Sequence, residues 1–228
     1  MDAKDIFLTS FPDGARDAKD VVIVIDVFRA FTTASYAFAS GASEIAMVGE
    51  LDEAAALKAS GRVDLLIGER KGLRPDGFDF NNSPTAVSGL DLKGKRIAQT
   101  TTNGTAGLVA AAKSSKLYAG AFVNAKATAL AASDANELTI VAAGREATQR
   151  ADEDEICAIY MRSIAAGWPH DAAALSQLAQ VWWGNEEFLS SREQYGPRTD
   201  WTLALELDRF DFAIRVTTED DLLVARPE

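Results

Sequence analysis

Apolar runs along the chain alternate with amphipathic segments, a pattern that predicts strands connected by helices. The first run, VVIVIDV at positions 21–27, is rich in β-branched residues and typical of a buried strand. Further strands are expected at 44–48, 63–67, 95–100, 116–122 and 137–142, and helices at 30–40, 51–60, 104–113, 154–166, 172–181 and from about 125. This alternation predicts an α/β fold with three α/β/α layers around a mainly parallel or mixed sheet.

Two segments do not follow the alternation. Residues 71–90 are rich in Gly, Pro, Asn and Asp and predict a long ordered loop. Residues 210–216 resemble a last strand after a less regular polar stretch. The length of 228 residues suits a single domain over positions 1–228. A boundary between two subdomains near 124–134 stays open, although no linker composition marks it.

Composition narrows the class of protein. The net charge of −11 disfavours nucleic acid and anionic membrane surfaces as partners. A single Cys rules out an intramolecular disulfide, and no signal peptide or long apolar segment is visible, so a cytoplasmic protein is expected. A small anionic substrate remains compatible with the negative charge, because arginines can reverse the field inside a cleft. Assembly into a homo-oligomer is left open.

Polar side chains follow five of the predicted strands. In open parallel sheets, ligands bind beyond the carboxyl ends of the strands, so these side chains are expected to converge on one crevice. They are Asp26 with Arg29, Thr32 and Thr33; Glu69 and Arg70; Thr101, Thr102, Asn103, Gly104 and Thr105; Asn124; and Gly144 with Arg145.

These residue types suggest capture of a phosphorylated anion beside a metal ion. Backbone N–H groups and hydroxyls of Thr102 and its neighbours at a helix start can cradle phosphate, and arginine forks can bind phosphate or sulfonate oxygens. Asp26 and Glu69 offer the hard oxygen ligands that Mg²⁺ prefers. Such a combination serves phosphoryl transfer.

Each feature also has an ordinary structural interpretation. The turn at 102–105 is a common helix start, Asp26 can cap the following helix, and Glu69 with Arg70 can form a surface ion pair. Recurrence at five strand ends favours a site. Dinucleotide and P-loop motifs are absent, and His170 is the single histidine. The acidic run at 152–155 suits a helix start, with one carboxylate free to face the site.

Three blocks resemble the 2-phosphosulfolactate phosphatase (ComB) family. They are DVFRAFTT at 26–33, GER at 68–70 followed by GFDFNNSP at 77–84, and TTTNGT at 100–105. Asn124, Gly144 with Arg145, Asp154 and Asp171 follow in the expected order, so the resemblance covers about residues 20–216. Phe31, Lys71 and Asn81 depart from the pattern, in which a third Thr, a Gly and a Gly are usual.

The resemblance implies a ComB-like α/β fold and an Mg²⁺-dependent phosphatase that converts 2-phosphosulfolactate to sulfolactate and phosphate. Asp26 and Glu69 would be the catalytic and metal-binding residues, with Asp26 as ligand or nucleophile. Arg29 and the turn at 102–105 would bind phosphate, and Arg70 with Arg145 the second anion. Further substrate contacts are expected from Thr32, Thr33, Asn82, Ser83, Thr101, Asn124 and Gly144.

Two other functions stay open on the sequence. The departures from the family pattern leave room for another phosphorylated 2-hydroxy acid as substrate. A non-catalytic sensor of a phosphorylated metabolite is the other alternative, although a pure anion binder gains nothing from carboxylates beside its anion. The roles of Asp154 and Asp171 are not assigned.

Overall fold

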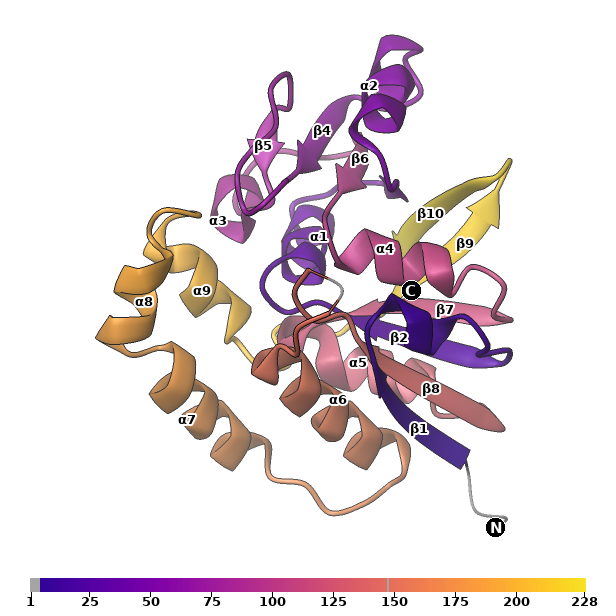
Figure 1. The fold of residues 1–228 in the computed structure, drawn as a ribbon, viewed down its shortest axis with the longest axis vertical. Coiled ribbons are helices and arrows are strands. Elements are labelled where there is room, and N and C mark those ends of the chain that lie inside the picture. The colour runs from indigo at the N-terminus through magenta and orange to yellow at the C-terminus, as the bar shows by residue number, and fades with distance from the viewer. Residues whose placement is uncertain (1–4, 147) are drawn as a thin grey trace.

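A computed structural model describes residues 5–146 and 148–228, and within them the strands form one ten-stranded mixed sheet (Figure 1). The strands are β1 (Asp5–Ser10), β2 (Val21–Ile25), β3 (Glu44–Met47), β4 (Leu65–Gly68), β5 (Phe80–Asn81), β6 (Arg96–Thr100), β7 (Lys116–Gly120), β8 (Glu137–Ala142), β9 (Ile214–Glu219) and β10 (Leu222–Pro227). Their order in the sheet is β1-β8-β2-β7-β9-β10-β3-β6-β4-β5. The predicted α/β class is confirmed.

Helices connect most of the strands and cover the sheet. They are η1 (Pro12–Ala15), α1 (Ala30–Ala39), α2 (Leu51–Ala59), α3 (Pro84–Val87), α4 (Gly104–Ala110), η2 (Phe122–Asn124), α5 (Ala125–Ala131), α6 (Asp152–Ala165), α7 (Ala172–Trp183), α8 (Glu186–Arg192) and α9 (Arg198–Ala204). In the described part of the chain, none is long and apolar enough to cross a membrane. The expectation that the N-terminus carries no signal peptide concerns a stretch whose first four residues, 1–4, lie outside the described residues.

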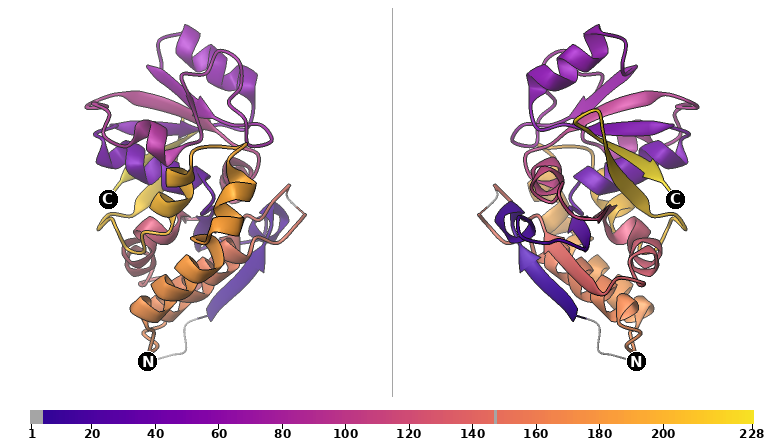
Figure 2. Two further views of the ribbon diagram at one scale, coloured as in Figure 1. Left: turned by 90° about the vertical axis from the view of Figure 1, so that its left-hand side faces the viewer. Right: turned by 90° about the vertical axis from the view of Figure 1, so that its right-hand side faces the viewer.

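The sheet consists of two parallel blocks that run in opposite directions. Strands β1, β8, β2 and β7 form one block, and β3, β6, β4 and β5 form the other. The hairpin β9–β10 lies between them, and its pairings with β7, within itself and with β3 are all antiparallel. Figure 2 shows the two blocks one above the other, with α7 and α8 along one side. Because three successive pairings are antiparallel, the strands of the two blocks run in opposite directions. The segments that follow the carboxyl ends of both blocks can therefore line one cavity.

The core lies on both faces of β2. Val22 and Val24 pack into the cluster that includes residues of α1 and α4, whereas Val21, Ile23 and Ile25 pack into the cluster that includes α5, α6 and α7. All five are at most 2% exposed. Burial on both faces is the reason that the run is apolar at every position, as its sequence predicted.

Several elements differ from the expectations. Strands β1 and β10 were not predicted, and the last strand expected at 210–216 is shifted to β9, which begins at Ile214. The expected loop at 71–90 contains β5 and α3. The polar stretch before the hairpin contains α8 and α9. The hairpin turn uses Asp220 and Asp221 with φ of 47° and 64°. This left-handed pair is typical of a two-residue hairpin, but Asp-Asp is a weaker signal than Asn-Gly.

Candidate active site

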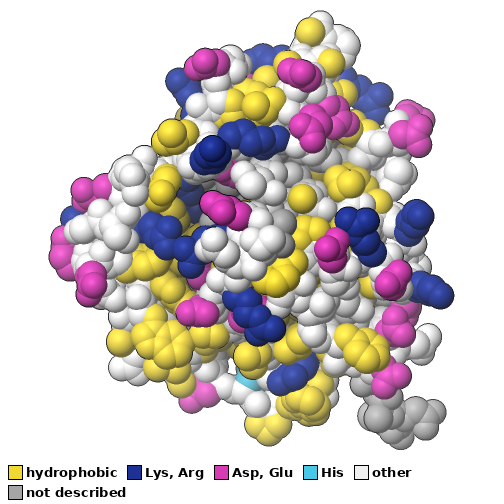
Figure 3. Space-filling model, in the orientation of Figure 1, with side chains coloured by type: hydrophobic (Ala, Val, Ile, Leu, Met, Phe, Trp, Pro, Cys, Tyr) yellow, Lys and Arg dark blue, Asp and Glu magenta, His cyan; other side chains and the backbone are white. Residues whose placement is uncertain are grey.

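A cavity of about 440 Å³ lies where the carboxyl ends of the two blocks meet. Its walls come from the segments that follow β2, β4, β6 and β8, and from the segment around α8 and α9. The lining residues are Asp26, Phe28, Arg29, Glu69, Lys71, Gly72, Asn82, Thr102, Asn103, Arg145, Glu146, Gln149, Glu153, Arg192, Tyr195 and Trp201. On the face seen in Figure 3, Lys and Arg side chains border a hollow left of the centre, with acidic side chains beside them.

Asp26 follows the last residue of β2 and is 6% exposed. Its Oδ1 accepts a hydrogen bond of 3.0 Å from the N–H of Ala30, at the start of α1. Burial, with the charges of Glu69 and Glu153, raises the pKa of Asp26 to about 7, although the N–H groups of Ala30 and Gly104 lower it. The carboxylate is therefore held in a fixed place, and it is repelled there by two other acids.

Glu69 follows the last residue of β4, and both of its carboxylate oxygens are occupied. Oε1 accepts from the N–H of Thr102 at 2.7 Å, and Oε2 accepts from the N–H of Gly72 at 2.7 Å. Two hydrogen bonds from separate loops fix the position of the carboxylate. Glu69 is thus positioned as precisely as Asp26, and both line one cavity, as the sequence predicted.

The turn at 102–105 differs from the phosphate cradle that its sequence suggested. The N–H of Thr102 is donated to Glu69, and that of Gly104 to Asp26. Thr101 and Thr105 bond each other, with each hydroxyl accepting from the other's N–H at 3.2 and 3.1 Å. The N–H groups of Thr102 and Gly104 thus bind carboxylates of the protein, and those of Thr101 and Thr105 stabilise the turn. The turn therefore positions Asp26 and Glu69.

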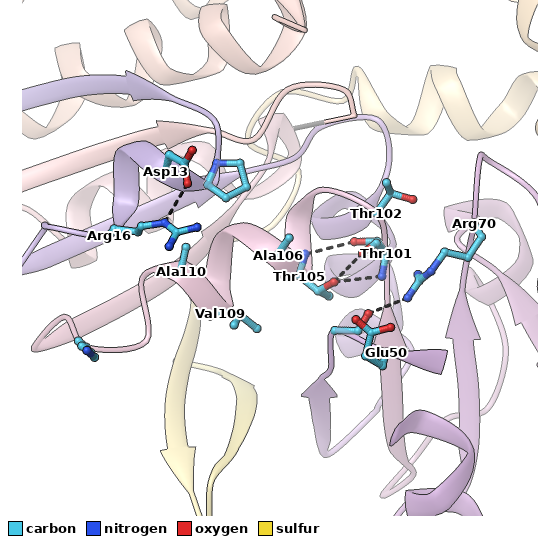
Figure 4. Close-up of a pocket in the computed structure, with 13 residues that line it drawn as sticks. Asp13, Arg16, Glu50, Arg70, Thr101, Thr102, Thr105, Ala106, Val109 and Ala110 are labelled. Atoms are coloured by element: carbon cyan, nitrogen blue, oxygen red, sulfur yellow. Dashed lines mark hydrogen bonds and ion pairs between the residues drawn. The ribbon is translucent and has the colours of Figure 1, made fainter. Parts of the chain in front are cut away.

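Arg70 lies outside this cavity. It lines a groove on the other side of the turn together with Thr101 and Glu50 (Figure 4). Its guanidinium donates to the carbonyls of Glu69 and Gly49 at 2.8 and 2.7 Å and to Thr100 Oγ1 at 2.9 Å. Successive residues after a strand point to opposite sides, so Glu69 and Arg70 face different spaces. The structure does not bring Arg70 together with Arg145.

Arg29 is 4% exposed and lies at the wall of the cavity. Its Nη1 donates to Asp200 Oδ2, its Nη2 donates to the carbonyl of Tyr195 at 3.0 Å, and its guanidinium lies 4.9 Å from the Trp201 ring centroid. These donors are engaged within the protein, so the geometry gives no support to the predicted phosphate contact of Arg29.

Other predicted contacts lie in the protein interior. The hydroxyl of Thr32 donates to the carbonyl of Val27 at 2.8 Å, and Asn124 bonds the backbone of Ala119 and Ala121. Both are fully buried, as is Thr33. The polar atoms of Thr32 and Asn124 bond backbone groups near the strand ends, which explains polar residues at these two positions without a ligand. The hydroxyl of Thr33 is buried without a hydrogen-bond partner.

The remaining predicted residues divide between the cavity and its support. Asn82 lines the cavity and accepts from Gln99 Nε2 at 3.1 Å. Ser83 caps α3 and donates to Asp200 at 2.6 Å, so it lies in the support. Gly144 has φ of 74° and donates its N–H to Asp154 at 3.0 Å. Arg145, next to it, lines the cavity.

Asp154 and Asp171 have structural positions. Asp154 is 2% exposed, and its two oxygens accept from the N–H groups of Val27 at 2.8 Å and Gly144 at 3.0 Å. It thereby joins the ends of β2 and β8. Burial, with the charges of Asp26 and Glu153, raises the pKa of Asp154 well above its ordinary value. Asp171 is the N-cap of α7 and accepts from the N–H of Ala174 at 2.9 Å.

The sequence did not single out several cavity residues. Glu153, 7% exposed, belongs to the acidic run of which one member was expected to face the site. Arg192 and Tyr195 come from α8 and the segment after it, and no motif marked them. Lys71, with φ of 55°, occupies a backbone conformation that favours Gly, the residue usual there in the resembling family.

The donors that line the cavity decide whether it can hold a metal ion. Across residues 5–146 and 148–228, no group of three or more His, Cys, Asp or Glu side chains is arranged to hold a metal ion by itself. Mg²⁺ needs less, since it keeps several waters and uses one or two carboxylates with substrate oxygens. Asp26 and Glu69 fit that need, because each carboxylate is fixed and their mutual repulsion favours a cation between them.

Gly104 is required by a close approach between the two blocks. A Cβ at this position would lie 2.8 Å from Ala30 Cβ and 2.9 Å from Asp26 Oδ2. We expect Gly104→Ala to lower the free energy of unfolding by about 1–3 kcal/mol, as overpacking does. Urea denaturation measures the change. Gly49→Ala is the control, because nothing lies within 4 Å of its Cβ position. Equal stability of both variants would contradict the close approach.

Comparison with known proteins adds a family. The sequence model of the protein family described as 2-phosphosulpholactate phosphatase matches residues 9–196. A "Probable 2-phosphosulfolactate phosphatase" of Bacillus subtilis (strain 168) is 42% identical over 153 residues, which is 65% of each chain. One of Carboxydothermus hydrogenoformans is 45% identical over 120 residues, 52% of this chain and 50% of that one. One of Prochlorococcus marinus (strain MIT 9313) is 33% identical over 220 residues, 87% and 88% of the two chains. The matches to the first two relatives thus span half to two thirds of their length.

Proposed function

The chain belongs to the 2-phosphosulfolactate phosphatase family, and from this premise we propose that it is an Mg²⁺-dependent phosphatase that hydrolyses 2-phosphosulfolactate in the cavity around Asp26 and Glu69. One observation carries the proposal. Two carboxylates from the opposed blocks are fixed by backbone N–H groups in the same cavity. A pure anion-binding site has no use for such a pair, whereas a phosphatase that employs a cation does.

Asp26 and Glu69 have the positions that a metal-dependent phosphatase requires of its carboxylates. Asp26 and Glu69 would hold Mg²⁺, which when bound supplies Lewis-acid stabilisation of charge on the phosphoryl oxygens. An aspartate here can act as a metal ligand or attack phosphorus itself, and in both roles it must be ionised and held still. The N–H groups of Ala30 and Gly104 hold Asp26 in place and favour its ionised form, against burial and the charges of Glu69 and Glu153. The two N–H groups on Glu69 hold its carboxylate in place.

Exclusion of water and substrate orientation come from the segment around α8 and α9. Tyr195 and Trp201 close one wall of the cavity, and Phe28 packs 5.6 Å from the Trp201 ring. This apolar wall lowers the local dielectric and strengthens the charge interactions inside. Arg145 lines the same cavity, where it can meet an anionic group of the substrate. A cytoplasmic location is part of the proposal, supported by the buried free thiol of Cys157.

The test is phosphate release by the full chain. We expect release from 2-phosphosulfolactate in the presence of Mg²⁺, loss of release after chelation with EDTA, and recovery on adding Mg²⁺ again. A matched assay with 2-phospholactate tests the alternative of another phosphorylated 2-hydroxy acid. Full activity in a rigorously metal-free sample would contradict the proposed requirement for Mg²⁺. Binding of the phosphorylated acids without any release would favour the sensor over the enzyme.

A further inference from the structure

Acidic and basic side chains line the cavity together. Asp26, Glu69 and Glu153 are acidic, and Arg145 and Arg192 are basic. A cation with a phosphate group suits Asp26 and Glu69, and a separate anion suits the two arginines.

Within the described residues, neither Arg145 nor Arg192 takes part in an ion pair, and Nε of Arg192 is buried with no hydrogen-bond partner. Arg29, at the wall of the same cavity, is by contrast paired with Asp200. Burial and the charge of Arg145 lower the pKa of Arg192. Two arginines that line one cavity and form no ion pair within the described residues favour an anion between them.

Arg192 lies at the end of α8, outside the sheet. The segment after it is attached to the cavity wall, because the carbonyl of Tyr195 accepts from Arg29 Nη2 at 3.0 Å and from Asn81 Nδ2 at 3.2 Å. The Arg192 guanidinium lies 5.1 Å from the Phe188 ring centroid, and Phe188 packs 5.7 Å from Phe28. The contact with Phe188 restricts the Arg192 side chain before a ligand arrives.

We propose that Arg192, together with Arg145, binds the second anionic group of the substrate and makes the enzyme specific for phosphate esters that carry a carboxylate or sulfonate. The proposal rests on the proposed function for the identity of the transferred group, but the arginine site itself does not depend on catalysis. It replaces the pairing of Arg70 with Arg145 expected from the sequence, because Arg70 faces the groove on the other side of the turn.

The experiment compares binding and turnover in Arg192→Ala. Isothermal calorimetry with sulfolactate, which carries no phosphate, measures the arginine site directly. We expect the variant to bind sulfolactate about tenfold to a hundredfold more weakly, as for loss of a charge-assisted hydrogen bond. The ratio kcat/KM for 2-phosphosulfolactate is expected to fall by the same factor. For 4-nitrophenyl phosphate, which has no second anion, it should change less than about threefold.

Arg162→Ala is the matched control. Arg162 also has a buried Nε without a partner, but it lies on α6 against Trp168 and does not line the cavity. It should bind sulfolactate as the unchanged protein does. Equal sulfolactate binding by Arg192→Ala and the unchanged protein would overturn the proposal, as would no binding by either or an equal loss for both phosphate esters. If sulfolactate binding requires Arg192 but no ester is hydrolysed, the arginine site stands and the proposed function fails.

Discussion

Asp26→Asn is expected to lower turnover by about 100-fold or more, as for loss of a metal ligand or nucleophile. The replacement keeps the shape of the side chain and one oxygen for the N–H of Ala30. It removes the negative charge, which is what both roles of Asp26 require. The measurement is kcat for 2-phosphosulfolactate with saturating Mg²⁺.

The same variant should not lose stability. Burial and the charges of Glu69 and Glu153 disfavour the ionised form of Asp26, so a neutral amide relieves repulsion in the metal-free protein. We expect an equal or higher melting temperature without metal. Asp171→Asn, which changes the exposed cap of α7, is the control and should keep normal turnover. Near-normal turnover of a folded Asp26→Asn protein would reduce Asp26 to a helix cap.

Asp200→Ala is expected to cost about 3–5 kcal/mol of the free energy of unfolding, because it leaves the buried charge of Arg29 without its partner. Asp200 is fully buried and accepts from Arg29, from Ser83 Oγ at 2.6 Å and from the N–H of Thr85 at 3.0 Å. It thus joins α1, α3 and α9 beside the cavity. A loss of this size is a large part of the stability of an ordinary domain. Urea denaturation measures it.

An exposed ion pair in the same region provides the control. Arg198 and Glu186 lie 2.7 Å apart with side chains 41% and 75% exposed, so Glu186→Ala should cost far less stability than Asp200→Ala. The double variant Arg29→Met with Asp200→Leu should be more stable than Asp200→Ala, because it removes the unpaired charge. A similar small cost for Asp200→Ala and Glu186→Ala would show that the buried pair contributes little.

Few of the hydrogen bonds between the site residues could be predicted from the sequence. The sequence placed Asp26, Glu69 and the turn at 102–105 at strand ends, and the structure brings them to one cavity. It suggested that the turn binds phosphate, but the N–H groups of Thr102 and Gly104 go to the two carboxylates. Which acceptor a donor meets depends on residues distant in the chain, and no local pattern carries that information.

The sequence by itself determined the α/β class, most of the strands and helices up to α7, and the family. The run at 21–25 is apolar at every position because both faces of β2 are covered, and the blocks around Asp26, Glu69 and Thr102 mark the family on their own. Local periodicity and local motifs are enough for these conclusions, since each depends on neighbouring residues.

Only the tertiary structure decided how the strand ends meet. The antiparallel hairpin β9–β10 reverses one block relative to the other, so Asp26 from one block faces Glu69 and Gly104 from the other. The same arrangement sends Arg70 to a separate groove and brings Arg192, from a helix with no motif, next to Arg145. Strand order and direction arise from pairings between residues far apart in sequence, and the hydrophobic pattern of a strand is the same whichever neighbour it pairs with.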